Sequence, residues 1–267
     1  MNTFADTWAW VTDPANWRGE EGLWHLMLQQ LLLTFTALGI ALAIGLPIAL
    51  WLGHLGRGGF LAINISNVGR AVPTFAVLAL LVMWEPVGND NLGPYGRAGL
   101  ATLLALAVFG LPPIVTNAYV AVDEVAPDVR EAADGMGMTS WQKFWRVELP
   151  LAAPLLFAGV RLALVQIWAT ATIAALVAGP GLGNVITRGF ANDDYPQGLG
   201  GAVVVAAVAL VLEVVSAIVQ RALGTSRPDT RGGKPRDTEG GQDARTTDGG
   251  FGPAGGDVAG HGVVRGG

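Results

Sequence analysis

One polar segment of the chain, residues 121–150, carries residues whose types and spacing indicate a task. The residues that we single out in it are Glu131, Ala132, Ala133, Gly137, Val147, Leu149 and Pro150. Alanine is a strong helix former with a minimal side chain, so another protein can come close to a helix face that carries it. Glycine allows the chain to leave such a helix sharply and without steric cost. The chemistry that these residues offer is recognition by contact, not bond making.

The same segment predicts two short helices joined by a tight turn. Pro127 or Asp128 can begin the first, because acidic residues and proline are favoured in a first helical turn. Gly135 and Gly137 then permit a sharp exit. A second, amphipathic helix follows, and Leu149-Pro150 is expected to restart a helix afterwards. The side chains expected to pack together on the second helix are Trp141, Phe144, Trp145 and Val147.

The rest of the chain offers no constellation for covalent or metal chemistry. The phosphate-binding pattern Gly-x-x-x-x-Gly-Lys-Ser/Thr is absent, so we expect that this chain does not hydrolyse ATP. There is no cysteine, and His25, His54 and His261 are too dispersed for a metal site. No basic stripe indicates nucleic acid. We therefore expect no catalytic residue, no bound cofactor and no metal in this chain.

The spacing in residues 131–150 resembles the EAA loop of ABC-importer permeases. That family pattern is Glu-Ala-Ala, three residues, Gly, nine residues, a branched aliphatic residue, one residue and Leu-Pro, and every element is present here. The resemblance identifies the chain as similar to the inner-membrane components of binding-protein-dependent transport, with a MetI-like type I importer fold. A solvated loop helix whose Glu-Ala-Ala is an accident is the alternative, and the full spacing argues against it.

The resemblance implies a set of partners. The loop would seat in a groove of a separate ATPase subunit, where Glu131 would offer a charged contact. ATP and Mg²⁺ would be used by that subunit. A separate extracytoplasmic solute-binding protein and a second permease, identical or homologous, would complete the transporter, with the solute path between the two permeases.

Residues 118–189 further resemble the osmoprotectant branch of these permeases, which takes up glycine betaine, carnitine or choline. The stretches that carry this likeness are Gly135-Met136-Gly137-Met138-Thr139, Val147-Glu148-Leu149-Pro150-Leu151, Ala158-Gly159-Val160-Arg161, Thr170-Ala171-Thr172-Ile173-Ala174-Ala175-Leu176 and Gly181-Leu182-Gly183. Pro180 departs from the glycine-rich run that commonly precedes the last of these. Val72-Pro73-Thr74 also resembles the Ile-Pro-Ser of the family.

Three other functions stay open at this point. Methionine-type and other amino-acid permeases share the five-span plan and an Arg-x-x-Pro element such as Arg70 to Pro73. An ATP-independent secondary transporter would show inverted repeats, and none is evident in a chain of this length. A membrane scaffold that only binds a cytoplasmic partner is the third.

Polar and aromatic residues within the apolar runs are candidates for the solute path. The candidates are Asn67, Arg70, Thr74, Trp168, Thr170 and Thr172. Each also has a structural explanation: threonines bond to their own helix backbone, arginine can extend to the membrane interface, and tryptophan anchors that interface. Within the fifth run, Glu213 is either functional or paired with Arg161.

The elements that must position these residues are membrane helices. Runs of about 20 apolar residues match the thickness of a bilayer core. We predict an all-α polytopic membrane protein with about five spans, near residues 23–52, 60–84, 98–120, 151–178 and 199–219. In the second span, Arg70 is costly in hydrocarbon and Pro73 interrupts the helix ladder, so this span could be two half-helices.

The predicted organisation is an outward-facing segment 1–22, a permease domain 23–222 and a cytoplasmic tail 223–267. The tail is rich in Gly, Asp, Thr and Arg and has almost no large apolar residue, so we expect it to be disordered. Basic residues in the loops set the orientation in a bacterial inner membrane. They place the loop 121–150 and the tail in the cytoplasm and the N-terminus outside.

Overall fold

The computed structural model describes residues 3–56, 59–60, 64, 69, 71–88 and 91–224. Its helices are α1 (Thr3–Thr12), η1 (Pro14–Trp17), α2 (Leu23–His54), α4 (Thr74–Met83), α5 (Glu85–Gly88), η2 (Gly93–Tyr95), α6 (Gly99–Asp123), α7 (Pro127–Gly135), α8 (Ser140–Lys143), η3 (Phe144–Glu148), α9 (Leu149–Ala174), η4 (Ala175–Val177), α10 (Gly183–Ala191) and α11 (Tyr195–Gly224). The described residues form no strand beyond one isolated bridge between Asn91 and Arg97. The all-α class predicted from the sequence is confirmed.

Four helical segments of the described chain are long and apolar enough to cross a membrane. They are α2, α6, the run Ser140–Val177 that contains α9, and α11. Their positions confirm the predicted first, third, fourth and fifth spans. Prolines inside α2, α6 and α9 do not end these helices, as is usual for helices surrounded by other helices or lipid.

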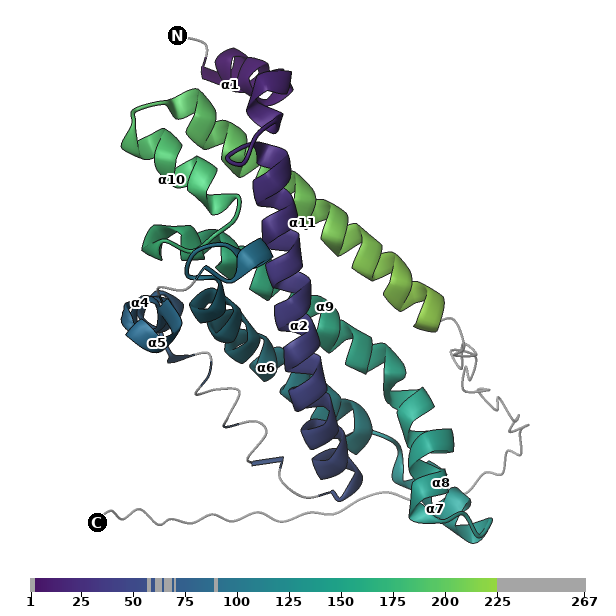
Figure 1. Ribbon diagram of the computed structural model, residues 1–267. Coiled ribbons are helices and arrows are strands. Elements are labelled where there is room, and N and C mark those ends of the chain that lie inside the picture. The colour runs from purple at the N-terminus through teal and green to yellow at the C-terminus, as the bar shows by residue number, and fades with distance from the viewer. Residues whose placement is uncertain are drawn as a thin grey trace, which may run out of the picture. The chain divides into compact units, whose positions relative to one another are not determined.

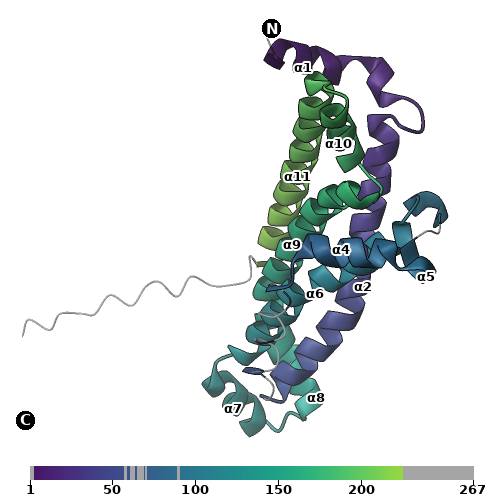
Figure 2. The same cartoon turned by 90° about the vertical axis from the view of Figure 1, so that its left-hand side faces the viewer.

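The second predicted span takes a different form in its described part. Pro73 is the N-cap of α4, so the break expected at this proline is present. The ten residues of α4 measure roughly 15 Å, about half of a bilayer core. In Figure 2 this helix lies across the long helices. Asn67 and Arg70 lie outside the described residues, as does the tail from residue 225 onward.

The core lies where α2, α6 and α9 pack on one another. Its buried side chains include Leu33, Leu106, Ile114 and Ile167, which come from all three helices. Of the apolar stretch of α6, 72% is buried, against 6% for α11. Thus α6 is the centre of the bundle, while α11 leaves a long apolar face for lipid or another membrane helix.

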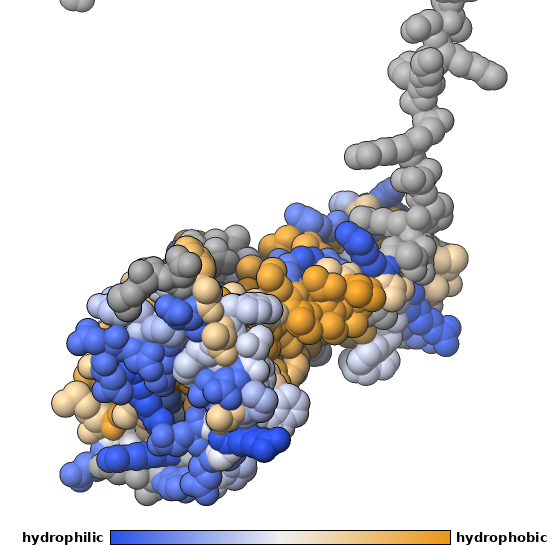
Figure 3. All heavy atoms as spheres, turned by 90° about the horizontal axis from the view of Figure 1, so that it is seen from above, coloured by the Kyte–Doolittle hydropathy of each residue, from blue (hydrophilic) through white to orange (hydrophobic). Residues whose placement is uncertain are grey.

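The polar segments gather at opposite ends of the bundle. Both ribbon views place α1 and α10 at one end and α7 and α8 at the other (Figures 1 and 2). Seen from the α1 end, hydrophilic residues cover the near surface and an apolar flank extends beside them (Figure 3). This distribution matches a bundle whose middle lies in hydrocarbon and whose ends lie in water.

Candidate functional site

Helix α7 holds the Glu-Ala-Ala sequence and ends in a defined turn. Gly137 has a φ of 76°, the left-handed conformation that follows many helices. Its N–H donates to the carbonyl of Asp134 at 2.9 Å, and the N–H of Met138 donates to that of Ala133 at 3.2 Å. This pair of bonds is the Schellman arrangement, which satisfies the last carbonyls of the helix. The exit predicted for Gly137 is therefore confirmed, whereas Gly135 stays within the helix.

The helix that follows this turn is capped at its start and paired with α7. Thr139 caps α8 by accepting from the N–H of Gln142, and the Gln142 side chain accepts from the N–H of Thr139. Lys143 Nζ also lies 2.8 Å from an Asp134 carboxylate oxygen. These contacts make α7 and α8 one small unit that projects from the spanning helices.

The faces of α7 divide the Glu-Ala-Ala residues. Glu131 and Ala132 are exposed, whereas Ala133 is only 1% exposed. The expectation that Ala133 offers a close approach to another protein is therefore wrong, because its methyl group is turned into the chain. The exposed residues of this helix and its C-cap, at which a partner could sit, are Pro127, Asp128, Glu131, Ala132, Asp134, Gly135 and Met136.

The junction with the fourth span also differs from the prediction. Helix does not restart at Leu149-Pro150, since η3 is a π-helical turn that joins α8 to α9 without a break. The aromatic cluster predicted here is present: the ring centroids of Phe144 and Trp145 are 5.3 Å apart, and those of Trp141 and Trp145 are 5.5 Å apart. Helices α8 and α9 thus form one continuous helix.

A buried carboxylate at this junction binds three helices together. Glu148 is 1% exposed, and its Oε2 lies 2.6 Å from Nδ1 of His54 at the end of α2. Its Oε1 lies 3.3 Å from Nε of Arg130 in α7, an ion-pair distance without hydrogen-bond alignment. The guanidinium of Arg130 also donates to the carbonyl of Val122 near the end of α6. The ends of α2, α6 and α9 are therefore all tied to α7.

The path candidates of the fourth span lie within the bundle. Trp168 is 1% exposed and donates its indole N–H to the carbonyl of Val205 at 3.2 Å. Thr170 is also buried and bonds to Gln166 O at 2.8 Å, the backbone bond expected of helical threonines. Thr172 makes the same kind of bond to Trp168 O at 3.2 Å. Their path roles stay predictions, and Thr74 is half-buried in the first turn of α4.

Gln30, which no sequence motif singled out, connects this face of α9 to the Gly181-Leu182-Gly183 turn. Its side chain is fully buried, donates to Thr172 Oγ1 at 2.9 Å and accepts from the N–H of Leu182 at 2.8 Å. A Cβ on Gly183 would lie 2.1 Å from the carbonyl oxygen of Thr172, so this close approach demands glycine. The polar Gln29-Gln30 pair inside an apolar run was the signal for this contact.

Comparison with known proteins places this architecture in a family. The family model for the inner membrane component of binding-protein-dependent transport systems matches residues 24–227. The chain belongs to this family. It is a permease subunit.

Several proteins similar to this permease come from bacteria. It is 34% identical over 203 residues to the osmoprotectant import permease protein OsmY of Salmonella typhimurium, covering 75% of this chain and 82% of OsmY. It is 28% identical over 193 residues to the glycine betaine/carnitine/choline transport system permease protein OpuCB of Bacillus subtilis, covering 72% and 84% of the two chains.

Among solved structures, the permease resembles a chain of the MetNI methionine ABC transporter in an inward-facing form. The TM-score is 0.62 at 22% identity, over 73% of this chain and 93% of the other. A second crystal form of the same transporter gives 0.61 at 21% identity, over 79% and 99% of the two chains. At this identity the likeness supports the fold, which agrees with the MetI-like fold implied by the sequence.

The permease pairs charges across two of its membrane helices. Arg161 of α9 and Glu213 of α11 form an ion pair in which Arg161 Nε donates to Glu213 Oε1 at 2.9 Å. The pairing of these two residues, one of the two explanations given for Glu213, is therefore confirmed. Arg161 Nη1 also donates to Gln220 Oε1 at 3.3 Å.

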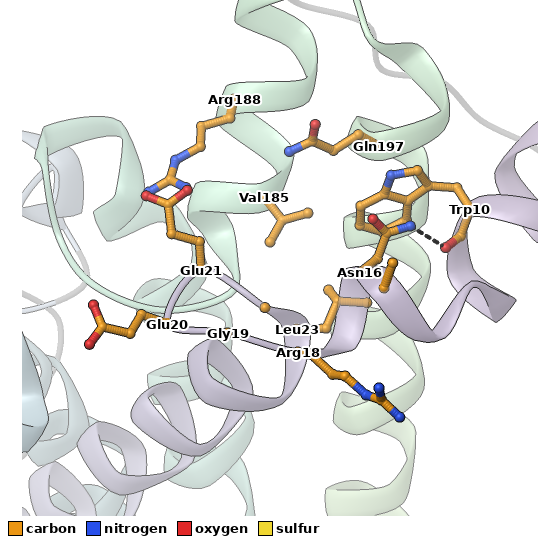
Figure 4. A pocket seen from close by; sticks show the side chains of 12 residues that line it. Trp10, Asn16, Arg18, Gly19, Glu20, Glu21, Leu23, Val185, Arg188 and Gln197 are labelled. Atoms are coloured by element: carbon orange, nitrogen blue, oxygen red, sulfur yellow. Dashed lines mark hydrogen bonds and ion pairs between the residues drawn. The ribbon is translucent and has the colours of Figure 1, made fainter.

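At the opposite end from α7, the permease has a hollow of about 420 Å³ between its N-terminal segment and α10. Figure 4 shows Arg188 of α10 reaching toward Glu21, and their closest atoms are 2.7 Å apart. Both side chains are well exposed, so the pair adds little to stability. Its place at the end of the bundle makes it a surface feature, not a buried site.

Proposed function

We propose that this permease carries osmoprotectants of the quaternary ammonium class, such as glycine betaine, carnitine or choline, into the cell in an ATP-driven importer. What supports the proposal is the exposed Glu-Ala-Ala helix between two spanning helices, together with relatives whose names give these solutes. A third relative, the choline transport system permease protein OpuBB of Bacillus subtilis, is 29% identical over 195 residues, 73% of this chain and 85% of OpuBB.

The energy comes from a separate ATPase subunit that binds ATP and Mg²⁺ and seats on the exposed face of α7. Glu131 supplies a charged contact there, and Ala132 lets the partner approach closely. Glu148 and Arg130 support this model, since they connect α7 to the ends of three spanning helices.

The orientation that fits this coupling places α7 in the cytoplasm and the α1 and α10 end outside. An extracytoplasmic solute-binding protein delivers the solute at the outer end. A second permease, identical or homologous, packs beside the chain, and the largely exposed apolar face of α11 is a surface available to it.

The test is uptake by proteoliposomes that contain the permease with its ATPase and solute-binding protein. We expect labelled glycine betaine to accumulate only when ATP is supplied on the side of the membrane that carries the ATPase. Excess choline or carnitine should compete more strongly than methionine. Uptake that continues without ATP would contradict the coupling, and stronger competition by methionine would contradict the solute class.

The same assay tests the docking face. The Glu131→Lys variant reverses the charge of an exposed side chain, so we expect normal membrane amounts. Uptake is expected to fall by roughly tenfold or more, the loss typical of reversing one charge at an interface. Normal uptake in this variant would count against α7 as the docking element.

A further inference from the structure

Four polar side chains from three membrane helices border one hollow of about 480 Å³. They are Asn117 of α6, Arg161 of α9, and Glu213 and Gln220 of α11. The Arg161–Glu213 pair occupies its wall, and Gln220 bonds both to Arg161 and, at 3.3 Å, to the carbonyl of Pro154. A hollow of this size is in the range of small-molecule sites.

The charged side chains at this hollow are only partly covered by the helices of the chain. The side chains of Arg161 and Glu213 are 34% and 37% exposed. Charged groups that face lipid at this depth are costly, so membrane proteins turn them toward water, a solute or another protein. The hollow therefore faces something polar in the assembled transporter.

The hollow lies within the membrane-spanning part of the bundle. Arg161 is in α9, which runs from Leu149 to Ala174, and Glu213 is in α11, which runs from Tyr195 to Gly224. Solute sites of transporters lie within this part of the chain, where charged side chains are otherwise rare.

The hollow continues toward the end of the bundle that carries α7. A second hollow of about 550 Å³ shares Ala158 and Gln220 with the first. It reaches Glu124 at the end of α6 and Val129 in α7. Together the two hollows, which we call the α9 groove, run from mid-span to the end proposed as cytoplasmic.

The ion pair has capacity for a further ligand. The hydrogen bonds that Glu213 accepts from described residues all end on Oε1, which leaves Oε2 to interact with a ligand. A guanidinium has five N–H donors, of which Arg161 uses one on each nitrogen. The pair can therefore open to take one negative and one positive group without a net change of charge.

We propose that the α9 groove is a solute site in which Arg161 binds the carboxylate and Glu213 the quaternary ammonium of a zwitterionic solute. A quaternary ammonium has no N–H to donate, so its attraction to Glu213 is electrostatic, whereas the carboxylate can take a two-point contact from Arg161. This inference rests on the proposed function and names the residues that would contact the solute inside the permease.

The natural absence of cysteine allows a direct test of access to the groove. In the assembled importer, the Ala158→Cys variant is exposed to a trimethylammonium methanethiosulfonate reagent from the side of α7. The Val211→Cys variant is the control, since Val211 is exposed on α11 at about 160° around the helix from Glu213. We expect Ala158→Cys to react at least about tenfold faster than the control, because the charged reagent reaches only thiols in contact with water and reacts with the thiolate. Glycine betaine should slow the reaction of Ala158→Cys.

Two results of this experiment overturn the proposal. One is labelling of Ala158→Cys that is no faster than the control, which would mean that lipid or protein fills the groove. The other is labelling of Ala158→Cys that glycine betaine does not slow, which would mean that the solute does not occupy the groove.

Uptake kinetics test the assigned roles. Glu213→Gln and Arg161→Gln are expected to raise the KM for glycine betaine by roughly tenfold. Arg161→Gln should have a smaller effect on choline, which has no carboxylate. Equal effects of Arg161→Gln on both solutes, or a fall in kcat alone in either variant, overturn the assignment. If the wild type does not import glycine betaine, the proposed function fails together with this inference. If the wild type imports it and the variants have the same kinetics as the wild type, this inference fails alone.

Discussion

At the scale of single residues, Glu148 is a buried charge that connects α7 to the spanning helices. It bonds to His54 and lies against Arg130. Because Glu148 is only 1% exposed, water cannot replace these partners. Replacing it with alanine would leave the guanidinium of Arg130 without its counter-charge. Losing one partner of a fully buried pair costs about 3–5 kcal/mol, and the 23% exposure of Arg130 makes the loss smaller here.

We expect the Glu148→Gln variant, which keeps the shape and a hydrogen bond to His54, to insert normally but to couple poorly. ATP hydrolysed per glycine betaine imported should rise by about threefold or more, because α7 would move with less effect on α2. The measurement is the ratio of ATPase rate to uptake rate, with Lys143→Gln as a control that breaks the more exposed pair with Asp134. An unchanged ratio in Glu148→Gln would show that the buried pair only stabilises the fold.

The residues that the sequence could and could not reveal differ in a physical way. Glu131 and Gly137 stand in a pattern of fixed spacing, so the pattern alone locates them. Gln30 contacts Leu182, and Glu148 contacts His54, across 94 or more positions in the chain. Such long-range partners cannot be assigned from local sequence, although a polar residue inside an apolar run marks where to look.

At the scale of elements, the turn after α7 is the most exposed link in the proposed coupling. Gly137 holds a positive φ, and nothing lies within 4 Å of the position that a Cβ would take. A Val there would therefore meet no clash, but its left-handed conformation would cost about 1–2 kcal/mol. The strain would fall on the turn that orients α7 relative to α8.

We expect Gly137→Val to reduce uptake by roughly tenfold or more while the amount in the membrane stays near that of the wild type. The matched control is Gly137→Asn, since asparagine adopts the left-handed conformation more readily and should retain most of the uptake. Equal losses in the two variants would indicate that a side chain at this position blocks the partner, and that backbone strain is not the cause.

The elements themselves were predicted with different success. Long apolar runs specify α2, α6, α9 and α11, because hydrophobicity over about 20 residues is a strong signal. The sequence did not predict the continuous π-helical junction at η3. Pro150 fits a helix that begins after a break and also one that continues from the preceding helical turn. In the second span, Pro73 gave the correct break, but no pattern indicated that α4 would lie across the bundle.

At the scale of the whole molecule, the proposal depends on which end of the bundle faces the cytoplasm. Arg130, Lys143 and Arg146 lie in the segment that includes α7 and α8, while Arg18 and Arg188 lie toward the other end. The excess of positive charge at the α7 end is modest, so the orientation is best tested directly. The two ends carry exposed residues that are suited to such a test, Asn192 after α10 and Glu124 after α6.

In a chain without native cysteine, the Asn192→Cys and Glu124→Cys variants each carry a single thiol. With a maleimide that does not cross membranes, we expect Asn192→Cys to react in intact spheroplasts and Glu124→Cys to react only after the membrane is opened. The reason is that four spanning helices separate an aqueous outer end from the end that must meet a cytoplasmic ATPase. The reverse pattern would place α7 outside the cell, where no ATPase could reach Glu131, and the coupling model would be wrong.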